Sequence, residues 1–542
     1  MDSSFPIRSR APEEGGIQIS VWSIALIFLV LYVCLFSGLG ALGLVGPDEP
    51  RYAAIARAMA ETRDWVTPRL WGTPWFEKPV LYYWAAGISM RLFGVSEFAE
   101  RLPSALAALL AVIAVAWTAL RSYGVGACRY ALLMLPTSVA LIGFSRAASP
   151  DMLFAGFLAA SMAVASEILQ RRRPGPLLRI AFGFFLGVAT LAKGPAAVIL
   201  AAGATLLWGA LSRRWTAPFR FLHPLIVAVF CVTSLPWYIL CALRNPDFFR
   251  VFILEHNFAR YLTPVFEHRQ PFWFYGPVLS LATIPWVVAL FGSFFRRWTG
   301  DDWKTSPSLF ALCWATFPFL FFSFSQSKLP GYILPSIPPL FLFLCDAMQH
   351  LFAAGRRGAA MWMGTTGALL ALTAVFSEKA LLRNARIFSV PDSRAVLLLL
   401  LIGIGGLIAV ALSLRKRPMA AFTALVLTVV SFLAFMNLEA LPAADYRISA
   451  RAAAADAQRL DPFMKDIGYR DLARNWHFGL NYYFNRELPE WTPGTPPPEW
   501  VFLPEKDAGE LSGFGKRVRE ASRAGAPFAV LFHVSPDSPE AQ

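Results

Sequence analysis

The chain has 542 residues, of which 56% are hydrophobic and 15% are charged, and its mean hydropathy is +0.50. Soluble domains carry about 25% charged residues, so this composition excludes a soluble globular protein and indicates an integral membrane protein. The net charge of +14 does not indicate a nucleic-acid partner, because the basic residues form short blocks between apolar segments and no continuous basic stripe.

Thirteen segments are apolar enough to cross a membrane, which takes about 17 to 25 residues each. The first is too long for the core of a signal peptide, so we expect it to be retained. The predicted segments are 21–45, 103–120, 127–144, 150–168, 178–192, 194–212, 222–243, 272–292, 307–324, 332–349, 358–377, 395–414 and 418–437.

Blocks of arginine and lysine, such as 171–173, 213–214 and 415–417, follow the even-numbered segments. Cytoplasmic loops are enriched in these residues, so we expect those loops and the N-terminus inside and the other loops and the C-terminus outside. The six cysteines lie in or beside apolar segments without metal-type spacing, which predicts buried thiols.

The outside loops are unusual in length and composition. Residues 46–102 contain a predicted amphipathic helix, in which Tyr52, Ile55, Ala56 and Met59 share one face. Aromatic residues follow it, and a second outside loop, 244–271, has a similar composition. Interfacial helices of this kind suit a substrate that lies in the outer leaflet.

The composition becomes polar from about residue 438, which predicts a membrane domain over 1–437 and an outside α/β domain over 438–542. Two apolar runs, Trp500–Leu503 and Phe528–Phe532, are predicted strands, and the polar stretch Gly509–Arg523 between them is a predicted helix.

Most charged side chains of the outside loops fit a site for a phosphate-bearing substrate. Lysine and arginine both bind phosphate well in poorly hydrated surroundings, although each one alone could equally snorkel or neutralise a nearby acid. The candidate cations are Lys78, Arg146, Lys193, Arg260, Arg269 and Lys328.

Four outside acids, Asp48, Glu49, Glu77 and Asp151, are candidates for a general base or a cation ligand. Asp48 alone could instead be a plain helix N-cap. Glu77 with His256 could hold a divalent cation, either zinc or magnesium or manganese.

No phosphate-binding glycine loop, dinucleotide fingerprint or nucleophile elbow occurs in the sequence, so no nucleotide cofactor is expected. An activated lipid that reaches an outside site from the membrane fits the pattern better than a nucleotide sugar.

Several motifs together resemble the bacterial aminoarabinose (4-amino-4-deoxy-L-arabinose) lipid A transferases. This family belongs to the polyprenyl-phosphate-sugar-dependent GT-C glycosyltransferases, which include the protein O-mannosyltransferases. The motifs are Asp48-Glu-Pro-Arg-Tyr-Ala53, Phe76-Glu-Lys-Pro79 with Tyr82-Tyr-Trp84, Ser149-Pro-Asp151, Ala192-Lys-Gly-Pro195 and Lys328-Leu-Pro-Gly-Tyr-Ile-Leu-Pro335.

The resemblance implies a polytopic, mainly α-helical GT-C membrane protein of the bacterial inner membrane, with a small periplasmic α/β domain. It implies an inverting transferase that moves aminoarabinose from undecaprenyl phosphate to a lipid A phosphate, a lipopolysaccharide modification linked to polymyxin resistance.

Roles carried over from the family fall on residues of the matching motifs. Glu77 and His256 match the cation ligands, and Lys78 and Arg260 match the donor-phosphate contacts, with Arg269, Lys193 and Lys328 as further candidates. The expected catalytic acids are Asp48, Glu49 and Asp151, and the expected substrate-binding residues are Arg51, Tyr52, Tyr82 and Tyr332.

Two alternatives stay open at this point. The enzyme could transfer another polyprenyl-linked sugar, such as a hexose, mannose or amino hexose, to a lipid, polysaccharide or protein hydroxyl. A lipid or sugar transporter is the alternative from another class, but transporters place charges near the bilayer midplane, whereas these gather at one face.

Overall fold

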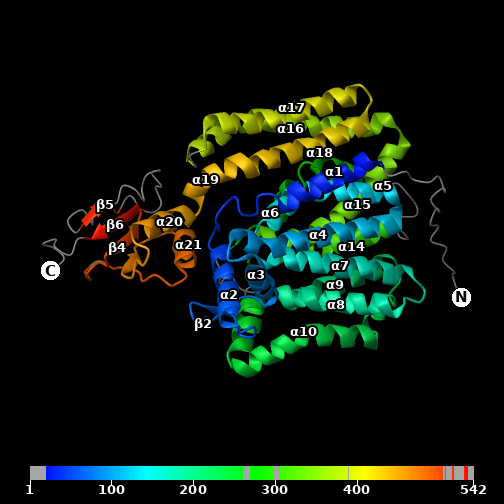
Figure 1. Cartoon of the computed structure of the whole chain (residues 1–542). Coiled ribbons are helices and arrows are strands. Elements are labelled where there is room, and N and C mark those ends of the chain that lie inside the picture. Colours follow the sequence, from blue (N-terminus) through cyan, green and yellow to red (C-terminus); the bar gives the residue numbers. More distant parts are fainter. Residues whose placement is uncertain are drawn as a thin grey trace.

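The computed structural model describes residues 20–259, 269–297, 306–387, 390–492, 494–504, 507, 515–517 and 530–534. Long helices run side by side in a bundle, and a small sheet lies at the end where the chain finishes (Figure 1). The sequence predicts this mainly helical membrane fold, and the structure confirms it.

Every predicted membrane segment overlaps an apolar helix in the described residues, although the helix in the first segment, 21–45, ends at Phe36. Eight helices are long enough to span a membrane, two bent helix pairs pass the same test together, and three apolar helices are shorter. The shorter ones are α1 with η1 (Val21–Phe36), α9 (Ala196–Leu211) and α14 (Pro307–Ser323). The eight long ones contain α4 (Glu97–Tyr123), α7 (Pro150–Gln170), α8 (Pro176–Lys193), α10 (Pro224–Arg244), α15 (Ile337–Ala354), α16 (Arg356–Ile387), α17 (Asp392–Leu414) and α18 (Pro418–Phe435).

The predicted segments 127–144 and 272–292 are not straight helices. The first consists of α5 (Val125–Met134) and α6 (Val139–Ser145), which are bent by 60°. The second consists of α12 (Tyr275–Ala282) and α13 (Val287–Arg297), which are bent by 119°. A proline, Pro136 or Pro285, lies at each break and cannot supply the amide that would continue the helix.

The two breaks contact each other. The amide of Val139 donates to the carbonyl of Ile284 over 3.1 Å, and the indole of Trp286 donates to the Thr137 hydroxyl over 3.0 Å. Each break thus supplies partners for polar groups that the other break exposes inside the bundle.

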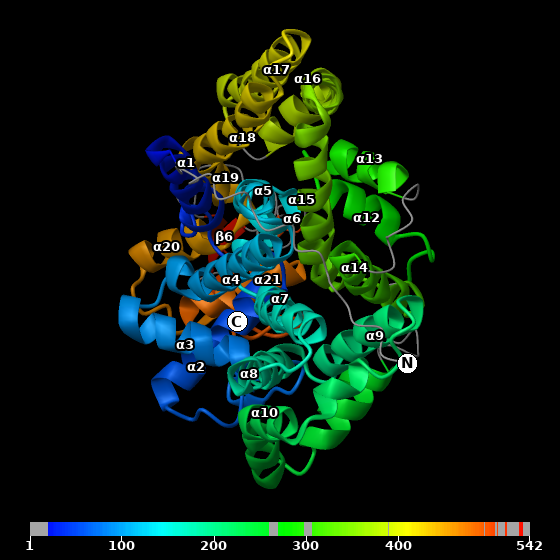
Figure 2. The same ribbon diagram turned by 90° about the vertical axis from the view of Figure 1, so that its right-hand side faces the viewer.

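Helix α7 occupies the centre of the bundle, as the view along the helices shows, with α16 to α18 at one edge and α10 at the other (Figure 2). Small residues let its neighbours approach closely. A Cβ atom added at Gly156 of α7 would lie 2.3 Å from the carbonyl oxygen of Ala107 in α4, so only glycine fits there.

The loop 46–102 folds into α2 (Asp48–Thr62), β1 (Arg69–Leu70), β2 (Thr73–Pro74) and α3 (Leu81–Phe93). The predicted face of α2 is buried, but so are Arg51, Ala53 and Ala54 beside it. The helix is therefore packed into the protein on most sides, and it runs across the long helices at one end of the bundle (Figure 1). In the loop 244–271 the described part contains η3 (Arg250–Ala259), with η2 (Pro218–Leu222) before α10.

The C-terminal region after residue 438 continues from the membrane bundle without a break in the helix. Helix α18 continues through η6 (Met436–Ala440) into α19 (Leu441–Ile448), so the predicted boundary at 438 falls within a helical stretch. The elements that follow are α20 (Arg451–Leu460), β3 (Ile467–Tyr469), α21 (Arg474–Phe484), β4 (Trp500–Leu503), β5 (Gly515–Arg517) and β6 (Val530–Val534).

The strands form one sheet in the order β3-β4-β6-β5, with β3 and β4 parallel and the other pairs antiparallel. Strand β4 matches the prediction for Trp500–Leu503, and β6 covers the described part of the predicted run Phe528–Phe532, whose first two residues lie outside the described residues. The predicted helix over 509–523 is wrong at 515–517, which form β5, and its remaining residues lie outside the described part.

Candidate active site

The site begins at the first turn of α2. Gly46 has a φ of +67°, and Pro47 occupies the cap position, so Asp48 is the first helical residue and makes no capping hydrogen bond. The plain N-cap alternative for Asp48 is therefore wrong. Its side chain is 54% exposed, which leaves the carboxylate accessible.

Arg51, one turn further along α2, contacts more of the neighbouring charged groups than Asp48 does. Its guanidinium pairs with Asp48, donates to the carbonyl of Pro47 over 3.0 Å and lies 3.4 Å from a carboxylate oxygen of Glu77. The rings of Trp75 and Phe478 cover it, with centroids 5.6 and 5.2 Å from the guanidinium carbon. The side chain is only 8% exposed, so these contacts fix its orientation.

Glu77 and Lys78 lie next to Arg51. The Lys78 ammonium is 3.1 Å from the second carboxylate oxygen of Glu77, and both side chains are largely covered. The cluster of Asp48, Arg51, Glu77 and Lys78 thus places two cations against two carboxylates at the edge of the bundle.

A second cluster comes from three other elements. Asp151 at the start of α7 forms an ion pair with Lys193 at the end of α8. The Lys193 ammonium lies 4.9 Å from the ring centroid of Tyr332, in η5 (Pro330–Ser336), and 5.5 Å from that of Phe154. The sequence therefore placed Asp151, Lys193 and Tyr332 correctly on one face of the protein, and the structure brings them into contact.

Tyr52 connects the two clusters. It is 4% exposed, and burial raises its pKa well above the ordinary value. Three carboxylates raise this pKa further, those of Glu77, Asp48 and Asp151. Acids from both clusters therefore act electrostatically on the same phenol.

The ring of Tyr82 packs edge-on against the ring of Tyr52, and the ring of Tyr83 is tilted to it. The hydroxyl of Tyr82 donates to the carbonyl of Glu100 over 3.1 Å, and its side chain is fully buried, which indicates a packing role and not the expected substrate contact. The buried hydroxyl of Tyr83, by contrast, has no hydrogen-bond partner among the described residues.

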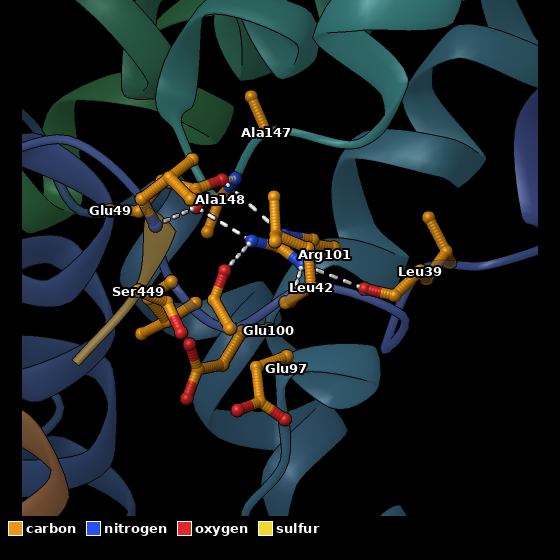
Figure 3. Close-up of polar contacts among 12 residues, drawn as sticks. Leu39, Leu42, Glu49, Glu97, Glu100, Arg101, Ala147, Ala148 and Ser449 are labelled. Carbon is orange, nitrogen blue, oxygen red and sulfur yellow. Dashed lines mark hydrogen bonds and ion pairs between the residues drawn. The ribbon is translucent and has the colours of Figure 1, made fainter. Parts of the chain in front are cut away.

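Glu49 is buried and fully engaged (Figure 3). Its carboxylate pairs with Arg101 over 2.8 Å and accepts from the amides of Val45 and Ala148 over 2.8 and 2.7 Å. Arg101 in turn donates to the carbonyls of Leu39, Leu42 and Gly43. This geometry favours a structural role for Glu49, which joins the start of α2 to the loop before α7, over the expected catalytic one.

Lys328 and Arg269 do not join the clusters in any described contact. The Lys328 ammonium donates to the carbonyls of Ser325 and Gln270 over 2.7 and 3.1 Å, and it thereby ties two loops together. Arg269 is exposed. Arg146, also a candidate cation, donates to the carbonyls of Val33, Cys34 and Ser37 and so caps the end of the first helix.

The metal prediction is untested. Among the described residues no group of three metal-binding side chains occurs. Glu77 is described and already contacts Arg51 and Lys78, whereas the His256 side chain and Arg260 lie outside the described residues. The described residues alone do not fit a metal, so no step below depends on one.

The sequence did not predict the contacts that the C-terminal region makes with this site. Phe478 of α21 covers Arg51, and in the same helix Tyr482 bonds to Glu100 while Tyr483 donates to Glu97 over 2.8 Å. Glu97 and Glu100 at the start of a membrane segment could have indicated such contacts, because carboxylates at that position need hydrogen-bond or ion-pair partners.

A helical membrane bundle with carboxylates and cations gathered at one end fits a membrane glycosyltransferase, and the comparisons with known proteins identify this class. Residues 21–252 match the family described as dolichyl-phosphate-mannose-protein mannosyltransferase. The fold also resembles the crystal structure of ArnT from Cupriavidus metallidurans bound to undecaprenyl phosphate, with a TM-score of 0.77 and 25% identity over 94% of this chain and 97% of that one.

The relatives define the family more narrowly. The undecaprenyl phosphate-α-4-amino-4-deoxy-L-arabinose arabinosyl transferase of Aeromonas salmonicida is 31% identical over 426 residues, which are 76% of each chain. The transferase of the same name from Edwardsiella ictaluri is 33% identical over 348 residues, 64% of this chain and 62% of the relative. The chain belongs to the family of undecaprenyl phosphate-aminoarabinose arabinosyl transferases.

Proposed function

We propose that the protein transfers 4-amino-4-deoxy-L-arabinose from undecaprenyl phosphate to a phosphate of lipid A. The observation that carries this proposal is the match, over nearly the whole chain, to a structure that holds undecaprenyl phosphate, combined with relatives named for this sugar donor. The resemblance of the motifs to lipid A transferases supports the acceptor.

In the proposed reaction an acceptor phosphate oxygen attacks the anomeric carbon, the bond from that carbon to the donor phosphate breaks, and undecaprenyl phosphate leaves with the electron pair. Lys78 would stabilise the departing phosphate, because a cation placed where negative charge develops lowers the barrier. Arg260 is the expected second contact. A phosphate acceptor is ionised near neutral pH, so Asp48 would orient substrate and would not need to remove a proton.

Arg51 would act through Asp48 and Glu77, since it contacts both carboxylates and its own position is fixed by two rings. Lys193 and Asp151 would contact the sugar or the acceptor. These roles rest on the proximity of the clusters and on the motif resemblance.

We place the protein in the bacterial inner membrane, with its N-terminus in the cytoplasm and its C-terminal region in the periplasm. The arginine-rich loops support this orientation, and the proposed acceptor would meet the site at the periplasmic face.

The test is mass spectrometry of lipid A from a host that lacks its own aminoarabinose transferase. We expect expression of the protein to add aminoarabinose to a lipid A phosphate, and Lys78→Met to abolish the addition. The matched control is Lys465→Met, which removes an exposed lysine distant in sequence from the site. Unmodified lipid A despite folded protein and available donor would favour another polyprenyl-linked sugar or another acceptor.

A further inference from the structure

A basic cavity lies at the end of the bundle opposite the candidate active site. Helix α7 has Asp151 of the site in its first turn, and α8 has Lys193 at its end, whereas the cavity lies where α7 ends and α8 begins. A helix of this length separates its ends by about 30 Å, so the cavity is distinct from the site.

Arginine dominates the lining of this cavity, whose volume is about 310 Å³. Arg220 is held in place by donation to the carbonyl of Arg171 over 2.9 Å. Within the described part of the chain, Arg172, Arg173 and Arg179 have no ion-pair partner. The lining consists of Ile168, Arg172, Arg173, Pro174, Arg179, Phe219, Arg220, Leu222 and His223.

The acid nearest in sequence does not neutralise these arginines. Glu167 already pairs with Arg121 over 3.1 Å and with Arg171 over 3.0 Å. Clustered like charges without counter-ions repel one another, so the cavity gains stability from an anion.

An apolar groove of about 280 Å³ continues from the cavity along the sides of α8, α9 and α10. Phe219 and Leu222 line both hollows, and they are 62% and 67% exposed. Apart from Thr205 the groove lining is apolar, and the Thr205 hydroxyl is engaged with the carbonyls of Ala201 and Ala202. The groove therefore offers contact to hydrocarbon and no polar partner.

We propose that the cavity and groove together bind one anionic glycerophospholipid, with its phosphate among the arginines and an acyl chain in the groove. The charge favours an anionic headgroup, and the continuous apolar surface favours a chain attached to it. Basic pockets between membrane helices recognise anionic lipid headgroups on this physical basis.

The experiment is native mass spectrometry of the full-length protein in detergent with defined lipids. The probes are dioleoyl phosphatidylglycerol, dioleoyl phosphatidylcholine, which carries no net charge, and inorganic phosphate. We expect selective retention of phosphatidylglycerol, and an approximately 25-fold weaker retention in Arg172→Ala/Arg173→Ala, because each arginine near an anionic lipid contributes about fivefold.

Two control pairs separate the contributions of charge and groove. Arg356→Ala/Arg357→Ala removes two exposed arginines from the start of α16, outside the cavity, and should leave retention unchanged. Ala202→Phe fills the groove and should weaken retention, whereas Ala228→Phe adds the same bulk to an exposed position of α10 outside the groove and should not.

Equal retention of the two phospholipids, or undiminished retention in Arg172→Ala/Arg173→Ala, would overturn the proposal. Binding of inorganic phosphate with no preference for the intact lipid would reduce the feature to an anion site and overturn it as well. The assay measures lipid binding and not sugar transfer, so its outcome is independent of the proposed function.

Discussion

Two neighbouring acids, Asp48 and Glu49, have opposite environments. Asp48 is half-exposed and pairs with Arg51, whereas Glu49 is buried and accepts hydrogen bonds from Arg101 and two backbone amides. Removal of Glu49 would leave the buried Arg101 without its counter-ion, whereas removal of Asp48 leaves Arg51 a second carboxylate, that of Glu77, at 3.4 Å. Substitution of Asp48 should therefore affect activity, whereas substitution of Glu49 should affect stability.

We expect Asp48→Asn to retain folding and lose sugar transfer. Glu49→Gln should lower the free energy of unfolding by about 3 kcal/mol, because Arg101 keeps its charge and loses its counter-ion. Thermal unfolding in detergent, measured beside lipid A modification in cells, distinguishes the two effects. A normally stable but inactive Glu49→Gln would restore the catalytic role expected from the sequence.

Phe478 provides a second residue-scale prediction. Its ring covers Arg51, and such a contact contributes about 0.5 to 1 kcal/mol at a partly exposed position. Phe478→Leu should therefore lower kcat/KM several-fold without loss of folded protein. Phe463→Leu makes the same change at a site that is 79% exposed and should have no effect. Equal activity of both variants would show that the C-terminal region does not orient Arg51.

At the residue scale the sequence predicts which side chains gather but not how they are paired. Asp48, Glu77, Lys78, Asp151, Lys193 and Tyr332 occur in short motifs on loops of one predicted face, and the structure groups them there. The role of Glu49 was not predictable, because its partner Arg101 lies 52 residues away and the pairing depends on how α4 packs.

At the scale of elements, helix α21 is fastened to the membrane bundle by polar contacts. The hydroxyl of Tyr483 accepts from the amide of Leu44 over 3.0 Å and donates to Glu97, which also lies 3.5 Å from Arg451. Burial raises the pKa of Tyr483 well above its ordinary value, so the hydroxyl keeps its proton for this donation at any physiological pH.

Tyr483→Phe should loosen this attachment by about 1 to 3 kcal/mol, because it leaves the Leu44 amide without a partner. Hydrogen exchange should accelerate in residues 38–45 and 474–484. Tyr469→Phe, which removes a hydroxyl that has no hydrogen-bond partner within the described residues, is the matched control. Unchanged exchange in Tyr483→Phe would mean that apolar packing alone holds α21.

The sequence predicted the positions of the membrane helices well because a run of about twenty apolar residues nearly always forms a membrane-spanning helix. It did not predict the bends, although Pro136 and Pro285 mark them, because proline also occurs within straight membrane helices that neighbours support. The C-terminal sheet was predicted only in part, because hydrophobic periodicity identifies short buried strands and says little about a polar edge strand such as β5.

At the scale of the whole molecule, the direction of each helix determines which elements lie at the same end of the bundle. Helix α16 has 32 residues and begins at the end of the bundle where α1 begins, whereas the sheet lies at the opposite end (Figure 1). Such a helix is about 48 Å long, more than the hydrocarbon thickness of about 30 Å, so its two ends reach opposite membrane surfaces.

This arrangement makes a labelling experiment decisive for orientation. The six native cysteines are buried or half-buried, so a cysteine introduced at an exposed position should dominate the reaction with a membrane-impermeant maleimide. Lys465→Cys, near the sheet, should be labelled in intact spheroplasts, whereas Arg357→Cys, at the start of α16, should be labelled only after the membrane is opened. The reverse pattern would place the active-site clusters in the cytoplasm, where a periplasmic lipid A phosphate could not reach them.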